Sequence, residues 1–416
     1  MNETNSRTDI NQTNPWAARG TFPPIKGIAV LLSVIVYFLC ALALPLLSYA
    51  WVSLALLALL FFYVVWIARN PHTVTAVLVS TAVVTVLTAS YAVGALYLSL
   101  LVGCMSGAFL LTTRRLPVLV TLLLPIAAAA IAYPLTGDVL TALFACAFLP
   151  AAALLAIATE GNRPRTSSLC FCIGGFLIGA LIFCAAAVYL KAGALNAEAI
   201  KSTVQAVRED ALHALISMRD EMLLRAKEAV IDEQTQGFYD QLVQLSTDRV
   251  LVEAVNTVFS LLPAAVIVLA SVIAFFSQML LLSSYRTIGW EKVLTPAARY
   301  LTVSVVASVL YALTFILMFL LPTGTVAYAT VQNLCLILMP GLFLVGCQML
   351  ITMLARARGG MRAFVIAMVA GVLCCYAGGA LLLIAMWGAY SRISFAIQKK
   401  LAKALESDDH HSDPNS

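Results

Sequence analysis

The side chains with the clearest chemical potential in this sequence are four amides inside long apolar segments: Gln278, Gln332, Asn333 and Gln348. An amide carries both donors and acceptors, so within a bilayer it can bond either to a neighbouring helix or to a polar solute. Asn333 and Gln348 are fifteen residues apart, about four helical turns, so we expect them to share a face that points into a helix bundle. Bonding between helices is the commoner use of such amides, and solute binding is the functional alternative.

Ionisable side chains are missing from the middle of every long apolar segment. Asp138 and Glu160 stand at segment ends, where a solvated position is the simpler interpretation; they are also the sole candidates for an enzyme acting on lipid. The HExxH zinc motif, the GxSxG elbow and the P-loop are absent, so we expect no enzymatic activity and no nucleotide site. Any movement of solute would then need a gradient or a separate ATPase partner.

Metal and cofactor chemistry find little support in the sequence. All ten cysteines fall within apolar segments, where a thiol behaves as a small hydrophobic group. There is no CxxC pair, and the four histidines form no ligand-like set. We therefore expect no metal, no disulfide and no cofactor.

Long apolar segments dominate the composition. Hydrophobic residues make up 62% of the 416 positions and charged residues 11%, against about 25% charged in soluble domains. Because unpaired backbone groups are costly in lipid, this predicts an all-α polytopic bundle of about eleven membrane-spanning helices. The expected spans are residues 27–48, 51–68, 74–89, 92–112, 116–133, 139–159, 169–190, 257–284, 297–321, 327–354 and 363–390.

Basic residues occur at every second loop, and such residues stay in the cytoplasm. Arg19 and Lys26 place the polar segment 1–26 inside as a disordered tail. The later topology-setting residues are Arg69, Arg114, Arg115, Arg163, Arg165, Arg286, Lys292, Arg299, Arg356, Arg358 and Arg362. This arrangement predicts a multi-pass protein of the bacterial cytoplasmic membrane, with the lipid bilayer as partner. A nucleic-acid-binding surface typically carries a run of basic residues with aromatic residues between them. The basic residues beside the spans form no such run, so we expect no nucleic-acid partner.

The carboxy-terminal segment 391–416 breaks this alternation. An eleventh crossing would place four basic residues outside: Arg392, Lys399, Lys400 and Lys403. Either one span is re-entrant or miscounted, or the short tail escapes the bias. An apolar helical face lies opposite the lysines, made of Ile393, Ile397, Leu401 and Leu405, so the segment can lie along a headgroup surface.

Residues 191–256 form the one long polar stretch, with a net charge of −4 and a predicted extracytoplasmic position. One amphipathic helix face is expected from Ile200, Val204, Val207, Ala211, Leu215, Met218, Met222, Ala226 and Ala229. Asn196 can cap this helix, and Gly237 is expected to break it. A second amphipathic helix, with Phe238, Leu242, Leu245 and Leu251, is expected to continue into the span from residue 257. Such a hairpin can pack on the bundle rim, lie on the outer leaflet or bind a partner.

Three segments of the carboxy-terminal half resemble the YybS-like family of uncharacterised bacterial membrane proteins: LLPAAVIVLASVIAFFSQMLLL from Leu261, VQNLCLILMPGLFLVGCQML from Val331 and GAYSRISFAIQKKL from Gly388. The second is the most specific, with Asn333 and Gln348 at matching positions. The third lacks acidic residues that the family carries near Ser391 and Ala396. The front spans of that family are similar to the substrate-binding S components of energy-coupling-factor transporters.

The resemblance implies a membrane protein with a solute-binding or transport-related role. The alternative is a structural or regulatory scaffold for an envelope or sporulation complex, which docks through the hairpin of residues 191–256. In either case the expected organisation is a tail (1–26), a first membrane half (27–190), the insertion (191–256), a second membrane half (257–390) and a basic amphipathic end (391–416).

Overall fold

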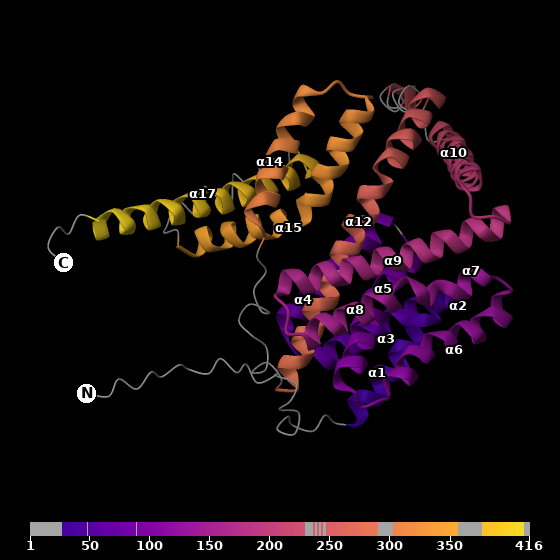
Figure 1. The fold of residues 1–416 in the computed structure, drawn as a ribbon. Helices are drawn as coiled ribbons and strands as arrows, with labels where there is room; N and C mark the ends of the chain where they lie inside the picture. Colours follow the sequence, from indigo (N-terminus) through magenta and orange to yellow (C-terminus); the bar gives the residue numbers. More distant parts are fainter. Residues whose placement is uncertain are drawn as a thin grey trace. The chain divides into compact units, whose positions relative to one another are not determined.

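The computed structural model describes residues 27–47, 49–88, 90–228, 236–237, 239–240, 243, 247–289, 303–356 and 377–411. Within these ranges the structure is helical and contains no strand, which confirms the predicted all-α fold (Figure 1). The helices are α1 (Gly27–Ala41), α2 (Ala43–Leu46), α3 (Ala50–Ala68), α4 (Pro71–Thr88), α5 (Tyr91–Thr113), α6 (Val118–Thr136), α7 (Val139–Ala142), η2 (Leu143–Ala147), α8 (Leu149–Glu160), α9 (Arg165–Ala192), α10 (Ala197–Glu228), α12 (Asp248–Thr287), α14 (Val305–Leu320), α15 (Val326–Arg356) and α17 (Ala377–His411).

The apolar helices correspond to the spans expected from hydropathy. Eight helical segments of the described chain are long and apolar enough to cross a membrane, and three shorter apolar helices, Gly27–Ala41, Pro71–Val83 and Val305–Leu320, accompany them. Ten of these helices lie over expected spans, whereas the last, Leu381–Ala402, shares only residues 381–390 with the expected span 363–390 and continues into the predicted amphipathic end. Residues 363–376 of that span lie outside the described residues. The expected span 139–159 is built from three pieces, α7, η2 and α8, because a 3-10 turn interrupts the α-helix.

The chain forms two compact units that interleave along the sequence. Unit 1 contains Met1–Cys184 and Leu269–Thr302, and unit 2 contains Ala185–Val268 and Val303–Ser416. Helices α9 and α12 therefore contribute residues to both units. The divisions expected at residues 190 and 256 follow chain order, and the second falls inside the continuous helix α12.

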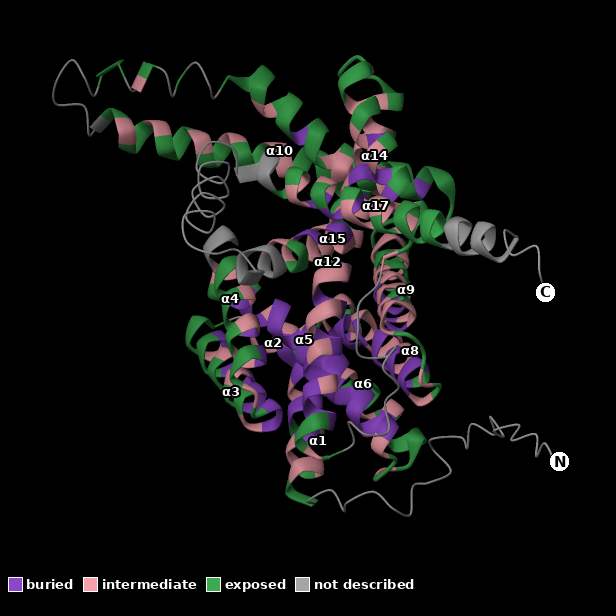
Figure 2. Cartoon of the chain, turned by 90° about the vertical axis from the view of Figure 1, so that its left-hand side faces the viewer, coloured by how far each residue is buried: buried purple, intermediate pink, exposed green. Residues whose placement is uncertain are grey.

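Unit 1 is organised around α5, most of which is buried. Helices α1, α3, α4 and α8 contact it, and Figure 2 shows buried residues along α5. Small residues make this close packing feasible. A Cβ atom on Gly107 would lie 2.8 Å from the Tyr37 ring, and one on Gly175 would lie 2.6 Å from the Ala151 nitrogen. Gly107 therefore lies where helix α5 meets α1, and Gly175 lies where α9 meets α8.

In unit 2, helices α14, α15 and α17 pack around a second apolar cluster of Tyr311, Cys335, Leu342, Ala385 and Ala389. The Tyr311 hydroxyl donates to the Leu382 carbonyl at 3.0 Å. Helices α15 and α17 approach each other through glycines, since a Cβ atom on Gly388 would lie 2.8 Å from the Gly346 nitrogen.

Helix α10 confirms the amphipathic helix expected in the polar stretch. The Asn196 Oδ1 accepts from the Ala199 N–H at 2.7 Å, so the predicted cap is present. Arg219 bonds to Asp248, which ties α10 to the first residue of α12. Gln236 and Gly237 are themselves helical, so the break predicted at Gly237 does not fall on that residue. Phe238, Leu242 and Leu245 lie outside the described residues.

Candidate functional site

The unit 1 part of α12 carries polar side chains that bond to backbone groups of other helices. Ser277 Oγ donates to the Leu101 carbonyl of α5 at 3.0 Å, and Gln278 Nε2 donates to the Arg165 carbonyl at the start of α9 at 3.0 Å. Both side chains are buried. Each such bond between membrane helices contributes about 0.6 kcal/mol on average, so these contacts position α12 against α5 and α9.

The last turns of α12 bond to the carboxyl end of α3. Ser283 Oγ and Thr287 Oγ1 both donate to the Ala68 carbonyl, at 3.1 Å and 2.8 Å. Ala68 is the final residue of α3, where carbonyls have no partner within their own helix. Two hydroxyls of α12 thus satisfy an acceptor that would otherwise be left unpaired.

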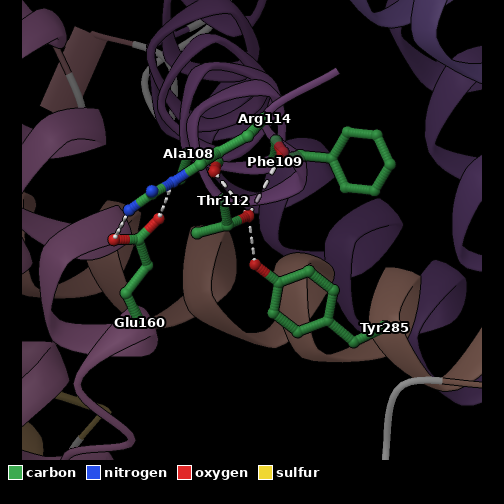
Figure 3. Close-up of polar contacts among 6 residues, drawn as sticks. All are labelled: Ala108, Phe109, Thr112, Arg114, Glu160 and Tyr285. Carbon is green, nitrogen blue, oxygen red and sulfur yellow. Dashed lines mark hydrogen bonds and ion pairs between the residues drawn. The ribbon is translucent and has the colours of Figure 1, made fainter. Parts of the chain in front are cut away.

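The end of α5 is held by Tyr285 and Thr112 (Figure 3). The Tyr285 hydroxyl donates to Thr112 Oγ1, and that oxygen in turn bonds to the carbonyls of Ala108 at 2.9 Å and Phe109 at 3.1 Å. Tyr285 and Thr112 are each 1% exposed. This chain of bonds joins α12 to the last turn of α5.

Arg114 and Glu160 form a two-pronged ion pair beside this chain (Figure 3). Arg114 Nη2 lies 2.9 Å from Glu160 Oε2, and Arg114 Nε lies 3.1 Å from Glu160 Oε1. The hydrogen bonds that Arg114 donates to the Glu160 carboxylate raise the pKa of the Arg114 guanidinium. Glu160, one of two acids considered for catalysis, is therefore engaged in joining the ends of α5 and α8.

Asp138, the other acid, caps helix α7. Its carboxylate accepts from the N–H groups of Leu140 at 3.0 Å and Thr141 at 3.2 Å, and from the Thr141 hydroxyl at 2.6 Å. The Thr141 hydroxyl, together with the backbone donors, holds the pKa of Asp138 below its ordinary value. Asp138 is exposed, as an acid at the end of a span is expected to be.

Four buried polar atoms of unit 1 have no hydrogen-bond partner within the described part of the chain: Tyr37 Oη, Thr81 Oγ1, Ser99 Oγ and Gln278 Oε1. Their residues are at most 8% exposed and belong to α1, α4, α5 and α12. The Tyr37 ring packs edge-on against Phe148, with the ring centres 5.9 Å apart. The interior of unit 1 therefore contains polar atoms that are free to bond within the part of the chain that the structure describes.

In unit 2, Asn333 of α15 bonds to α12 on both sides of a proline. Its Nδ2 donates to the Ser260 carbonyl at 2.8 Å, and its Oδ1 accepts from the Ala264 N–H at 3.2 Å. Pro263 stands between them inside α12 and weakens the ladder, because proline has no N–H and its ring displaces a preceding carbonyl. Ser260 and Ala264 are the i and i+4 groups that a regular helix pairs. One amide therefore binds both ends of that pair.

The remaining predicted amides do not join Asn333. Gln332 is half-buried on α15, and Gln348 is exposed further along the same helix. Gln278 belongs to the polar contacts of unit 1. Asn333 and Gln278 are thus helix-to-helix contacts in separate units.

The predicted topology-setting arginines stand at helix ends. Arg69 and Arg114 cap α3 and α5 in the left-handed conformation. Arg163 and Arg165 lie over the rings of Phe171 and Phe275, at 5.9 Å and 5.5 Å from the ring centres. Arg115 is exposed. Six further basic residues of the topology prediction lie outside the described residues: Arg19, Lys26, Lys292, Arg299, Arg358 and Arg362. The side chain of Arg356 is not described either.

Among the described residues, no group of three or more His, Cys, Asp or Glu side chains could hold a metal ion. Two of the described thiols lie close together: the buried sulfurs of Cys104 and Cys172 are 3.6 Å apart between α5 and α9.

Sequence reasoning missed the hydroxyls of α12. Ser277 and Ser283 lie in the expected span 257–284, which was judged only by its hydropathy, and Tyr285 and Thr287 follow directly after it. Their recurrence on one helix is a usable signal, since polar side chains in a membrane helix seek partners on neighbouring helices.

The helices and their internal polar contacts define a polytopic α-helical membrane protein. The sequence matches the family described as predicted membrane protein (DUF2232) over residues 108–389, about two thirds of the chain, and the protein belongs to this family. The matched range contains the segments from Leu261 and Val331 and ends just after Gly388. No curated protein and no solved structure matches the chain.

Proposed function

We propose that the protein is a non-enzymatic component of the bacterial cytoplasmic membrane that binds a small polar solute inside unit 1, as the S-component resemblance implies. The observation that carries this proposal is the set of four buried polar atoms without a partner in the described chain. Leaving a buried polar group unsatisfied costs about 1 to 3 kcal/mol. A solute that supplied matching donors and acceptors would recover part of that free energy.

The test uses the purified full-length protein in detergent, with thiamine, riboflavin, biotin, folate, pantothenate and nicotinate as probes. Thermal unfolding is measured with and without each vitamin. A bound probe raises the melting temperature by mass action. If none of them changes it, the vitamin-binding form of the proposal fails.

A matched pair of α5 variants separates solute binding from folding. Ser99→Ala removes an unpartnered hydroxyl, so we expect the stability of the free protein to stay level or rise while the vitamin-induced shift shrinks. Ser106→Ala removes a buried hydroxyl that bonds to the Gly103 carbonyl, so it should lower stability and leave the shift intact. A vitamin-induced shift in melting temperature that is unchanged in both variants would show that the solute does not contact Ser99.

A scaffold role is the second candidate, favoured by the exposed apolar face of α10. Six residues of this face are at least 38% exposed: Ile200, Val204, Val207, Leu215, Met218 and Met222. Exposed apolar residues at this spacing are typical of a helix that packs into a groove of a partner protein. In this role, the apolar face of α10 binds a protein of an envelope complex.

Site-specific photocrosslinking in cells tests the scaffold role. A crosslinker at Met218 should give one defined adduct, and Val204→Glu should abolish it. The same crosslinker at Ser217 serves as the neighbouring control. Equal labelling from both positions, or an adduct unaffected by Val204→Glu, would contradict docking through this face.

A further inference from the structure

Every basic residue in the described part of unit 1 stands at a helix end, and these six arginines form the arginine face: Arg69, Arg114, Arg115, Arg163, Arg165 and Arg286. The acids in the same part of the unit are Asp138 and Glu160. Glu160 is paired with Arg114, and Asp138 caps α7 at the opposite end of the α7–η2–α8 segment. The arginine face therefore carries a strong excess of positive charge.

Hydrogen bonds draw these helix ends together. Ser283 and Thr287, on either side of Arg286, bond to the carbonyl of the residue that precedes Arg69. Tyr285 bonds to Thr112, two residues before Arg114. Since α12 joins the ends of α3 and α5 in this way, Arg69, Arg286 and the Arg114–Arg115 pair border one area of the surface.

Several arginines of this face have exposed side chains: Arg69, Arg114, Arg115, Arg163 and Arg286. Arg69 and Arg115 have no ion-pair partner among the described residues. Arg69 and Arg114 also occupy left-handed backbone positions, with φ of 44° and 48°. Glycine or asparagine fills such a cap with less strain, so the backbone itself gives no reason for arginine there.

The helices that end at this face are candidate membrane spans, which places their ends at the level of lipid headgroups. A guanidinium presents a planar fork of donors that matches a phosphate group. We propose that the arginine face binds the phosphate groups of anionic phospholipids. This phosphate site is separate from the solute-binding site proposed for the interior of unit 1.

The test measures thermal unfolding of the full-length protein in neutral detergent during titration with phosphatidylglycerol, phosphatidylcholine or inorganic phosphate. Phosphatidylglycerol should raise the melting temperature at low micelle mole fraction, whereas the other two should not. Stabilisation by inorganic phosphate alone to the same extent would identify a free-phosphate site and overturn the lipid proposal. Equal stabilisation by both lipids would overturn it as well.

The triple variant Arg69→Gln, Arg115→Gln, Arg286→Gln should weaken the apparent affinity for phosphatidylglycerol by roughly tenfold to a hundredfold. The matched control, Lys201→Gln with Arg208→Gln, removes exposed charges from α10 and should leave the affinity unchanged. If the triple variant does not fold, Arg115→Gln alone should still lower the affinity by about fivefold. Unchanged affinity in the folded variants would refute the assignment.

Discussion

Asn333 shows how one side chain can supply hydrogen bonds to backbone groups of a membrane helix beside a proline. Its amide bonds to Ser260 and Ala264 across the position of Pro263 and also donates to the Ala329 carbonyl at 2.8 Å. The amide was predictable as a helix-to-helix contact. Its partner was not, because Pro263 lies about seventy residues earlier and nothing in the local sequence names the helix that α15 will meet.

We expect Asn333→Ala to lower the free energy of unfolding by about 1 to 3 kcal/mol, because it leaves the groups beside Pro263 without their amide partner. In a Pro263→Ala background the helical ladder can close, so the same substitution should cost distinctly less. Unfolding in mixed micelles measures both, and Gln332→Ala is the control on the same helix. Equal losses in the two backgrounds would show that Asn333 does not act through the proline.

Asp138 should make stability depend on pH through its cap of α7. The Thr141 hydroxyl and two N–H groups favour the carboxylate, so the pKa of Asp138 is lower in the folded protein than in the unfolded chain. Its contribution is therefore complete above the ordinary carboxyl range and is lost as pH falls through the lowered pKa.

The variant Asp138→Asn keeps a capping acceptor without a titrating group. We expect its melting temperature to fall less than that of the wild type between pH 7 and pH 3. A parallel decline of the two proteins would mean that Asp138 does not contribute to the acid response.

At the scale of elements, backbone contact between helices is set by single glycines. Gly346 of α15 lies so close to α17 that a Cβ atom would overlap the Ile384 carbonyl. Gly341, one and a half turns earlier, has ample space, since its nearest neighbour would be Val303 Cγ2 at 3.5 Å. Both residues are glycines, but only at Gly346 does a neighbouring helix come too close to leave room for a side chain.

Gly346→Ala should therefore destabilise unit 2 by about 1 to 3 kcal/mol, because overpacking forces α15 and α17 apart. Gly341→Ala should be neutral or slightly stabilising, since alanine favours the helix. Thermal unfolding of the two variants tests this contrast. Similar effects at both positions would argue against the close crossing at Gly346.

Helix α12 shows the limit of hydropathy for element boundaries. The second helix of the polar stretch was expected to continue into the span from residue 257, and α12 runs without interruption from Asp248 to Thr287. Hydropathy marks where a helix becomes soluble in lipid, whereas backbone bonding marks where it ends. The two need not coincide, because a helix can continue out of the bilayer.

At the scale of the whole molecule, charge bias predicts that α10 lies outside the cell and the arginine face inside. Ser217 of α10 and Arg115 are both exposed side chains. In a background without native cysteines, Ser217→Cys should react with a membrane-impermeant maleimide on intact cells. Arg115→Cys should react only after the membrane is opened. Labelling of both variants in intact cells, or of Arg115→Cys alone, would contradict the predicted topology.

The sequence by itself determined the fold class, the apolar helices, the Asn196 cap and the amphipathic helix α10. These features follow from local composition, because lipid requires each spanning segment to satisfy its own backbone groups. Only the tertiary structure decided that Asn333 bridges Pro263, that the hydroxyls of α12 bond to the ends of α3 and α5, and that Glu160 pairs with Arg114. These are contacts between helices distant in sequence, and an apolar pattern that suits lipid on every side does not specify which neighbour a helix will meet.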